Sequence, residues 1–343
     1  MKFALSADWH FAGYTQDKLI NGLPERLMAL KGCIESMLNH CMEHQIDRVV
    51  VAGDILHGKS IIYALAQSIL IDIFNTYPYI EFYLVDGNHD LSEKGQDAVS
   101  ALRGLVACDN VVLISRHLRD YFEYEGVAFV PHAYDMVETI KKNSCKYLVS
   151  HFGLNEAVLN SGVSIVSKMG LKDLVGKYEY VLLGHYHLPQ EMIADEIKVY
   201  YAGSPIQLDW GEKHEQKRFL IVDTDNDTVE SVPTVGYKQH HEFKITNENK
   251  EEIVEKAKKF QAIGHEVRIF RDDLGVDVEH LAEEFLIIDK AEKDITDRGI
   301  ESSMSLDEKF SKYLDIKGIK PEDQSKYLEV GLSIVERAAK ETQ

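Results

Sequence analysis

The sequence predicts an α/β layered fold in which strands alternate with amphipathic helices, and three observations indicate this class. Short runs of apolar, often β-branched residues alternate with longer segments in which apolar residues recur every three or four positions. Five of these runs are followed by aspartate, asparagine or histidine. With 343 residues, 45% of them hydrophobic, the chain is long enough for one large domain and a smaller one.

The expected strands and helices alternate along the first two thirds of the chain. In the first helix, Leu30 and Ile34 belong to one apolar stripe, and Pro24 lies where the first turn would begin. Strand–helix–strand order implies crossovers between neighbouring parallel strands. Helices are expected at 24–45, 60–77 and 96–107. Strands are expected at 2–7, 48–52, 81–85, 111–115, 127–131, 147–150, 180–183, 199–202 and 219–223.

The pattern changes near residues 233–236. A strand at 241–245, a helix at 250–262, a strand at 266–271 and a helix at 278–286 predict a small α+β unit. After a polar stretch, amphipathic helices are expected at 306–314 and 321–340. We therefore expect a large domain over 1–235, a small α+β cap domain over 236–290, and a linker with C-terminal helices over 291–343.

The composition restricts the class of protein. The chain has 38 Lys and Arg against 57 Asp and Glu, a net charge of −19. This argues against a stand-alone DNA-binding module, because a chain that holds nucleic acid by itself has a basic surface. The pairs Lys141–Lys142 and Lys217–Arg218 are interpreted as solvated loop charges.

The cellular compartment follows from the cysteines and the hydropathy. The four cysteines form no C-x-x-C pair, which favours a reducing compartment. No apolar run approaches the ~20 residues that span a bilayer. We therefore expect a soluble cytoplasmic protein, in a bacterial or phage-infected cell, without a membrane partner.

Potential metal ligands follow five of the expected strands. In open α/β sheets the carboxyl ends of the strands line the ligand crevice, so residues far apart in sequence can meet there. Glycines at positions 53, 87 and 184 would let the backbone turn sharply. The seven candidate ligands are Asp8, His10, Asp54, Asn88, His151, His185 and His187.

Carboxylate, imidazole and amide oxygen together suit Mn, Fe or Zn. On an extended segment, the side chains of residues two positions apart point in the same direction. The two ligands of each motif, D-x-H and H-x-H, are therefore expected to reach one metal. Seven ligands suit two ions that share a carboxylate. Two ions ~3.5–4 Å apart stabilise both the attacking and the leaving oxygen of an in-line phosphoryl displacement.

The ordered set D-x-H, G-D, G-N-H-D, H and G-H-x-H between residues 8 and 187 resembles the calcineurin-like metallophosphoesterase superfamily. D-W-H, with His57 three residues after Asp54, and the segment Y-A-G-S-P-I-Q-L-D-W-G-E at 201–212 resemble its SbcD-type DNA repair nucleases. The resemblance covers about residues 1–235, and the chain is similar in size to the compact versions of large bacteriophages. It departs after His10, where Phe11-Ala12-Gly13 replaces the usual Leu-Gly.

The resemblance implies a two-layered β-sandwich core flanked by helices, with a small cap domain and C-terminal helices. It assigns metal one to Asp8, His10, Asp54 and His187, and metal two to Asp54, Asn88, His151 and His185. Asp54 bridges the ions, which are expected to be Mn, with Mg, Fe or Zn as alternatives.

The implied activity is exonuclease and endonuclease cleavage of DNA, at ends, single strands or hairpins. His89 is expected to protonate the leaving oxygen, with Asp90 orienting its ring. His57 is expected to contact the scissile phosphate or position the strand. The implied partners are DNA, a second copy of the chain and an SbcC-type coiled-coil ATPase held by segments after the cap.

Alternatives remain open. Each histidine could instead be structural, and His57 could be an exposed loop residue. Trp9 and Tyr186 could stack on a base or pack in the core. The helix at 321–340 could pack on its own domain rather than on a partner. The whole chain could instead cut cyclic nucleotides or phosphoproteins, or be a non-catalytic scaffold for an ATPase.

Overall fold

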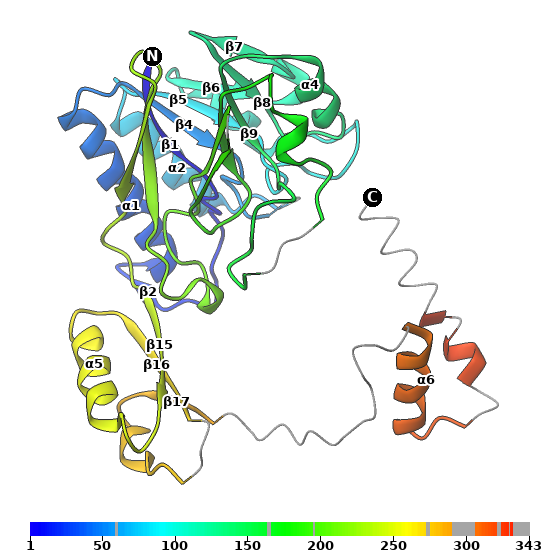
Figure 1. The fold of residues 1–343 in the computed structure, drawn as a ribbon. Coiled ribbons are helices and arrows are strands. Elements are labelled where there is room, and N and C mark those ends of the chain that lie inside the picture. The colour runs from blue at the N-terminus through cyan, green and yellow to red at the C-terminus, as the bar shows by residue number, and fades with distance from the viewer. Residues whose placement is uncertain are drawn as a thin grey trace. The chain divides into compact units, whose positions relative to one another are not determined.

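In the computed structural model the chain forms two compact units (Figure 1). The first comprises Met1–Glu242 with Ala257–Val267, and the second comprises Phe243–Lys256 with Arg268–Gln343. The structure describes residues 1–58, 61–162, 166–194, 196–271, 275–289, 306–320, 324–328 and 330–331.

The first unit contains a six-stranded sheet in the order β14-β13-β1-β4-β5-β6. Four neighbouring strands are parallel: β1 (Lys2–Ser6), β4 (Arg48–Ala52), β5 (Glu81–Val85) and β6 (Val111–Ile114). β13 (Arg218–Asp223) runs antiparallel to β1, and β14 (Thr228–Pro233) completes that edge. The parallel neighbours confirm the expected crossovers.

A second six-stranded sheet has the order β11-β12-β10-β9-β8-β7. Its parallel strands are β8 (Val127–Val130), β9 (Tyr147–His151), β10 (Tyr180–Gly184) and β12 (Ile197–Tyr201). β7 (Phe122–Tyr124) and β11 (Gln190–Ala194) form antiparallel edges. These edges and β14 were not expected from the sequence, because their half-exposed residues form no long apolar run.

Alternating side chains divide the core of the first unit into layers. Phe3 and Leu5 of β1 pack in one buried cluster with Val149 of β9 and Leu182 of β10, so the two sheets face each other. This arrangement confirms the expected β-sandwich. Val51 of β4 belongs to a different cluster on the outer face of the first sheet, because successive strand residues point to opposite faces.

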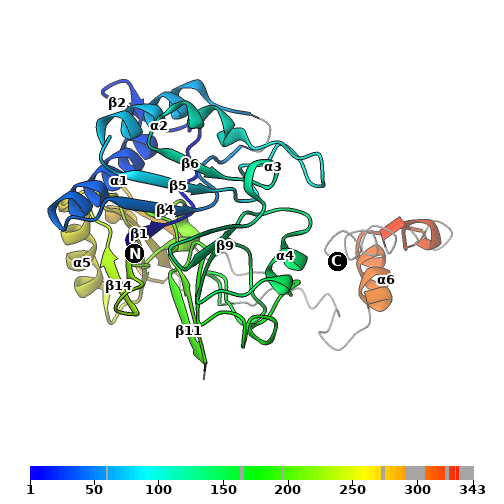
Figure 2. The same ribbon diagram turned by 90° about the horizontal axis from the view of Figure 1, so that it is seen from above.

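Helices cover the outer faces of both sheets. α1 (Glu25–Glu43) and α2 (Ala64–Thr76) supply Leu30 and Ile69 to the outer cluster of the first sheet. Figure 2 shows both helices on one side of β4 and β5, with β9 on the other side. α4 (Met136–Lys142) places Ile140 against the second sheet. The remaining short elements here are α3 (Arg116–Arg119), β2 (Leu19–Ile20), β3 (Leu23–Pro24), η2 (Leu171–Asp173) and η3 (Trp210–Glu212).

The expected helix at 96–107 is wrong in type and start. The chain instead forms a 3₁₀ segment, η1 (Ala101–Ala107). Ser100 sets the start, since its hydroxyl accepts a hydrogen bond from the Leu102 N–H at 3.2 Å. Gly104 lies inside the segment and lowers its α-helical propensity.

Residues 240–271 and 275–289 include a three-stranded sheet in the order β15-β16-β17. β15 (His240–Ile245), α5 (Lys250–Ala262) and β16 (Glu266–Arg271) match the expected elements. The helix expected at 278–286 is wrong. Val278 and Phe285 are buried on either side of the short η4 (Glu279–Leu281), and β17 (Leu286–Asp289) pairs with β16. The apolar residues that suggested one helix therefore belong to a 3₁₀ turn and a strand.

The C-terminal part contains α6 (Leu306–Ile316), in agreement with the expected helix at 306–314. Of the helix expected at 321–340, residues 321–323, 329 and 332–340 lie outside the described residues. Among the described helices, none is long and apolar enough to cross a membrane.

Candidate metal centre

The seven candidate ligands lie at or just after the carboxyl ends of five parallel strands. Asp8 and His10 follow β1, and Asp54 follows β4. Asn88 follows β5 in the same sheet, His151 ends β9, and His185 and His187 follow β10. The candidate ligands come from both of the facing sheets, and the structure brings all seven side chains into one cluster.

The turns that carry these residues have left-handed backbone. The φ angles are 53° at Asp8, 51° at His10, 52° at Asp54 and 104° at His185. Non-glycine residues rarely adopt this region, and each such residue costs ~1–3 kcal/mol. The expectation that D-x-H is extended is therefore wrong, although both of its side chains reach the cluster. Main-chain hydrogen bonds fix the turn: the Asp8 N–H donates to Gly53 O at 3.0 Å, and the His10 N–H donates to Asp54 O at 2.9 Å.

The three glycines provide space, and Gly53 alone of them also has the left-handed backbone of a sharp turn. Gly53 has a φ of +85°, and a Cβ there would lie 2.3 Å from His151 Nδ1. A Cβ on Gly87 would lie 2.2 Å from Asp54 Oδ1, and one on Gly184 would lie 2.1 Å from Ala52 O. No side chain fits at those separations, so the close approach of the strand ends requires glycine.

One group of contacts surrounds His10. Its Nε2 lies 2.9 Å from His187 Nε2 and 3.8 Å from Asp54 Oδ2. Asp8, His10 and His187 each offer a ligand atom, and these atoms lie within 4.8 Å of one another. These residues are the expected ligands of metal one.

A second group surrounds Asn88. Its Oδ1 lies 3.1 Å from His151 Nε2 and 3.0 Å from His185 Nδ1. His151 Nε2 also lies 3.3 Å from Asp54 Oδ2, which gives Asp54 contacts in both groups. His185 and His187 therefore reach different groups, in contrast to the expectation from H-x-H spacing alone. The left-handed backbone at His185 separates them.

The electrostatics of the cluster reflect its burial. Burial raises the pKa of Asp8 to about 6. Burial also opposes ionisation of Asp54, but His151 and His10 hold the pKa of this carboxyl well below its usual range. Burial by itself would lower the pKa of His151. The nearby Asp54 carboxylate has the larger effect and raises this pKa to about 9. Ionised carboxylates in such surroundings need a cation nearby.

His89 and His57 lie beside His10. The His57 and His89 rings are stacked, with centroids 5.3 Å apart, and His57 Nδ1 lies 3.1 Å from His10 Nδ1. His89 Nδ1 lies 2.8 Å from the His57 carbonyl oxygen, so this nitrogen donates the hydrogen bond.

Asp90 has different partners from those expected. Its buried carboxylate accepts hydrogen bonds from the N–H groups of Leu56 at 2.8 Å, Gly87 at 2.9 Å and Ile55 at 3.3 Å. Asp90 therefore holds the turns after β4 and β5, while the His57 carbonyl orients the His89 ring. A buried carboxyl group whose oxygens accept three main-chain hydrogen bonds is a structural anchor.

Residues 1–268 match the family model described as calcineurin-like phosphoesterase. The chain belongs to this family. It is a metallophosphoesterase with candidate His and Asp metal sites.

Two curated relatives are distant. The chain is 23% identical over 289 residues to the SbcD subunit of the nuclease SbcCD of Staphylococcus epidermidis, covering 74% of each chain. It is 23% identical over 266 residues to the protein of the same name from Staphylococcus saprophyticus, covering 67% of each chain.

Solved structures also match. A dimetal phosphatase from Danio rerio has a TM-score of 0.44 at 10% identity, covering 68% of this chain and 99% of that chain. An archaeal phosphodiesterase has a TM-score of 0.38 at 13% identity, with the same two coverages.

The donor set fits the divalent ions that are typical of this family. The His187 Nδ1–H donates to the carboxylate of Glu212, so its Nε2 presents a lone pair toward His10. Buried carboxylates, imidazole nitrogens and an amide oxygen converge without any thiolate. This chemistry suits a hard-to-borderline divalent ion, and Asp54 has contacts that suit a shared ligand.

Sequence reasoning missed the residues behind this cluster. Glu212 bonds the His187 ring at 2.7 Å, and the Tyr14 hydroxyl donates to His10 O at 2.5 Å. The interpretation of Lys217 and Arg218 as solvated charges is wrong: Lys217 is 0% exposed and Arg218 is 9% exposed. The only sequence signal for Glu212 and Lys217 was their position in the chain. Glu212 is the last residue of the 201–212 segment, and Lys217 directly precedes β13.

The aromatic residues inside the motifs are core residues. Trp9 is fully buried, and its indole N–H donates to Ser6 Oγ at 2.8 Å. Tyr186 is 6% exposed and packs beside Tyr201. Packing therefore accounts for both rings.

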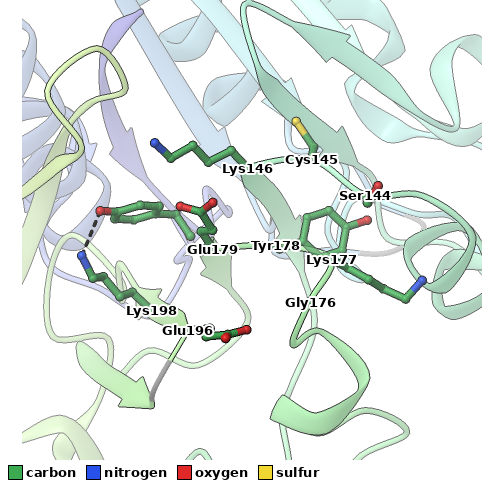
Figure 3. A pocket seen from close by; sticks show the side chains of 10 residues that line it. Ser144, Cys145, Lys146, Gly176, Lys177, Tyr178, Glu179, Glu196 and Lys198 are labelled. Atoms are coloured by element: carbon green, nitrogen blue, oxygen red, sulfur yellow. Dashed lines mark hydrogen bonds between the residues drawn. The ribbon is translucent and has the colours of Figure 1, made fainter.

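A cavity of about 640 Å³ lies elsewhere (Figure 3). Its lining includes Lys146 and Tyr180, at the amino ends of β9 and β10, whereas the candidate ligands lie at the carboxyl ends. Lys198 donates to the Tyr180 hydroxyl at 2.9 Å, and Lys146 pairs with Asp227 at 2.6 Å. The cavity and the candidate metal centre are therefore separate features.

Proposed function

We propose that this protein is a two-metal phosphodiesterase that cleaves DNA, as the nuclease subunit of an SbcC–SbcD-like complex that processes DNA ends. The observation that carries this proposal is the convergence of seven ligand-type side chains from five strand ends, with His89 beside them. Divalent ions held there, Mn foremost, would polarise the phosphodiester and lower the pKa of a water.

Residues of the protein have separate roles in the reaction. Asp54 contacts both ligand groups and sets the spacing between them. During hydrolysis the water oxygen bonds to phosphorus, and the bond from phosphorus to the leaving sugar oxygen breaks. Because the Nδ1–H of His89 donates to the His57 carbonyl, Nε2 is the nitrogen that faces the leaving oxygen, and His89 acts as the imidazolium, which gives its Nε2 proton to that oxygen and keeps the Nδ1 proton.

DNA as the substrate is supported by the names of the two curated relatives and by the Y-A-G-S-P segment. The net charge of −19 gives the chain a poor electrostatic match to duplex DNA. An SbcC-type coiled-coil ATPase and a second copy of this chain would then supply much of the DNA-holding surface. In this proposal 1–235 is the nuclease domain, 236–290 the cap, and 291–343 carries the ATPase-binding helices.

The test is cleavage of end-labelled linear duplex DNA in the presence of Mn²⁺, with and without the ATPase. We expect cleavage by the wild type and a loss of ~10²–10⁴-fold for His89→Ala, the usual contribution of a general acid. His44→Ala is the matched control, because His44 is exposed at the end of α1. Absence of Mn-dependent cleavage in every mixture would refute the nuclease proposal.

A small phosphodiester, bis(p-nitrophenyl) phosphate, separates the other functions. Turnover of this probe by a chain that leaves DNA intact would favour a phosphodiesterase of cyclic nucleotides or a phosphoprotein phosphatase. A scaffold role would require that His89→Ala leaves all biological activity unchanged while loss of residues 306–343 abolishes it.

A further inference from the structure

We propose that Glu212, supported by Lys217, is a positioning residue for His187 and thereby sets the affinity of one of the two metal positions. This inference rests on the proposed metal centre. It concerns a network of buried charges behind the ligand cluster. This network contacts His187 at two points, the ring and the main chain.

The first point is the His187 ring. Glu212 Oε1 lies 2.7 Å from His187 Nδ1, and because a carboxylate only accepts, Nδ1 must carry the proton. This fixes the tautomer and leaves Nε2 as the lone-pair atom. Nε2 lies on the opposite side of the ring, 2.9 Å from His10 Nε2 in the ligand cluster.

The Glu212 carboxylate has no freedom to turn. It is 1% exposed, and Oε2 accepts from the Leu208 N–H at 3.0 Å and from the Ser204 hydroxyl at 3.2 Å. The same oxygen lies 2.7 Å from Lys217 Nζ. Burial alone would raise the pKa of Glu212, but the hydrogen bond from His187 and the charge of Lys217 lower it to about 2.

The second point is the His187 main chain. Lys217 is fully buried, and its ammonium donates to His187 O at 2.9 Å. It also pairs with Glu215 at 2.7 Å. Lys217 therefore neutralises Glu212 and holds the backbone of the residue whose ring Glu212 orients.

At the other metal position, the outer ring nitrogen of His151 bonds no carboxylate among the described residues. His151 Nδ1 lies 2.8 Å from Ala52 O, so a neutral main-chain carbonyl fixes that ring. Outer partners of ligating histidines change metal affinity by ~10–100-fold when they are removed. Loss of the Glu212 charge should therefore weaken the ion that His187 holds and spare the ion near His151.

The experiment is Mn²⁺ titration of the full chain by calorimetry, with electron paramagnetic resonance on the same samples. For Glu212→Gln we expect one of two Mn²⁺ affinities to fall by ~10–100-fold, and the spin-coupled pair signal to give way to a mononuclear one. Glu215→Gln is the matched control, because Glu215 pairs with the same lysine and does not bond the His187 ring. It should bind two ions as the wild type does.

A second variant guards against misfolding. Glu212→Gln combined with Lys217→Met removes both members of this buried ion pair together, and Glu215, which loses its lysine, is only partly buried. It should fold, as judged by circular dichroism, and show the same selective loss of one ion. Two ions bound with wild-type affinities in both variants would overturn the inference. A wild type that binds no Mn²⁺ would instead overturn the proposed metal centre.

Discussion

At the scale of single residues, the cluster is assembled by strained turns and by the absence of side chains. Asp8, His10 and Asp54 all have φ near 50°, a conformation that main-chain hydrogen bonds between the two turns maintain. Gly87 and Gly184 let the strand ends approach to distances that any Cβ would block. The surrounding sandwich offsets the local cost of this geometry.

Asp54 is expected to be the least replaceable of the seven residues. Asp54→Asn keeps the shape but removes the carboxylate that contacts both ligand groups. We expect Mn²⁺ affinity to fall by more than the ~100-fold that loss of an outer partner costs. Asp47→Asn, an exposed position before the same strand, should leave Mn²⁺ binding unchanged in the same titration. Equal binding by both variants would contradict a bridging role.

Gly87→Ala should be destabilising and should impair metal binding. The added Cβ would lie 2.2 Å from the Asp54 main-chain nitrogen and from Oδ1, so Asp54 must shift. Gly32→Ala has the opposite expected sign, because its Cβ meets nothing within 4 Å and it lies inside α1. We expect a gain of about 0.5–1 kcal/mol there. Urea unfolding and Mn²⁺ titration of both variants measure the two effects.

At the scale of elements, five of the strands pack side chains in two layers and also carry a segment of the site at their carboxyl ends. β4 places Val50 between the sheets and Val51 against the helices, and then turns into Asp54. β1, β5, β9 and β10 do the same for the other ligands. The helices contribute no predicted ligand, and their role is to cover the outer faces and keep the strand ends in place.

The packing of α1 gives a quantitative expectation. Leu30 is fully buried in the cluster that α1 shares with the first sheet. Leu30→Ala should lower the free energy of unfolding by about 2–5 kcal/mol, through lost burial and a cavity. Met42→Ala lies on the same helix at 48% exposure and should change it by less than about 0.5 kcal/mol. Comparable midpoints in urea for the two variants would contradict the described packing.

At the scale of the whole molecule, the acidity of the chain and the exposed apolar residues of α6 are consistent with the proposed partner complex. The net charge of −19 opposes independent binding to DNA, and the second compact unit contains α6. Tyr313 and Ile316 of α6 are 43% and 46% exposed. Exposed apolar side chains on one helix suit docking in the groove of a partner.

The next prediction concerns the proposed ATPase partner. Tyr313→Lys combined with Ile316→Lys should weaken binding of the SbcC-type ATPase by at least ~10-fold, since two interface anchors commonly exceed about 1.4 kcal/mol together. Mn-dependent turnover of bis(p-nitrophenyl) phosphate should remain. Leu286→Lys, an apolar residue of β17 that is 58% exposed, is the control. Unchanged ATPase binding by the α6 variant would exclude this helix as the docking element.

The sequence by itself determined the α/β class, nearly all the parallel strands and the seven residues that the structure brings together. These features depend on local apolar runs and on the rule that ligand residues follow strand ends. It did not determine the strands β7, β11, β14 and β17, the 3₁₀ segments, the partners of Asp90 or the burial of Lys217.

Only the tertiary structure decided these features, because they depend on contacts between distant segments. Lys217 looks like a surface charge until β10 and the 201–212 segment surround it with Glu212 and the His187 carbonyl. The strand ends approach as closely as they do because the two facing sheets position them. No local sequence pattern predicts these short distances between the strand ends.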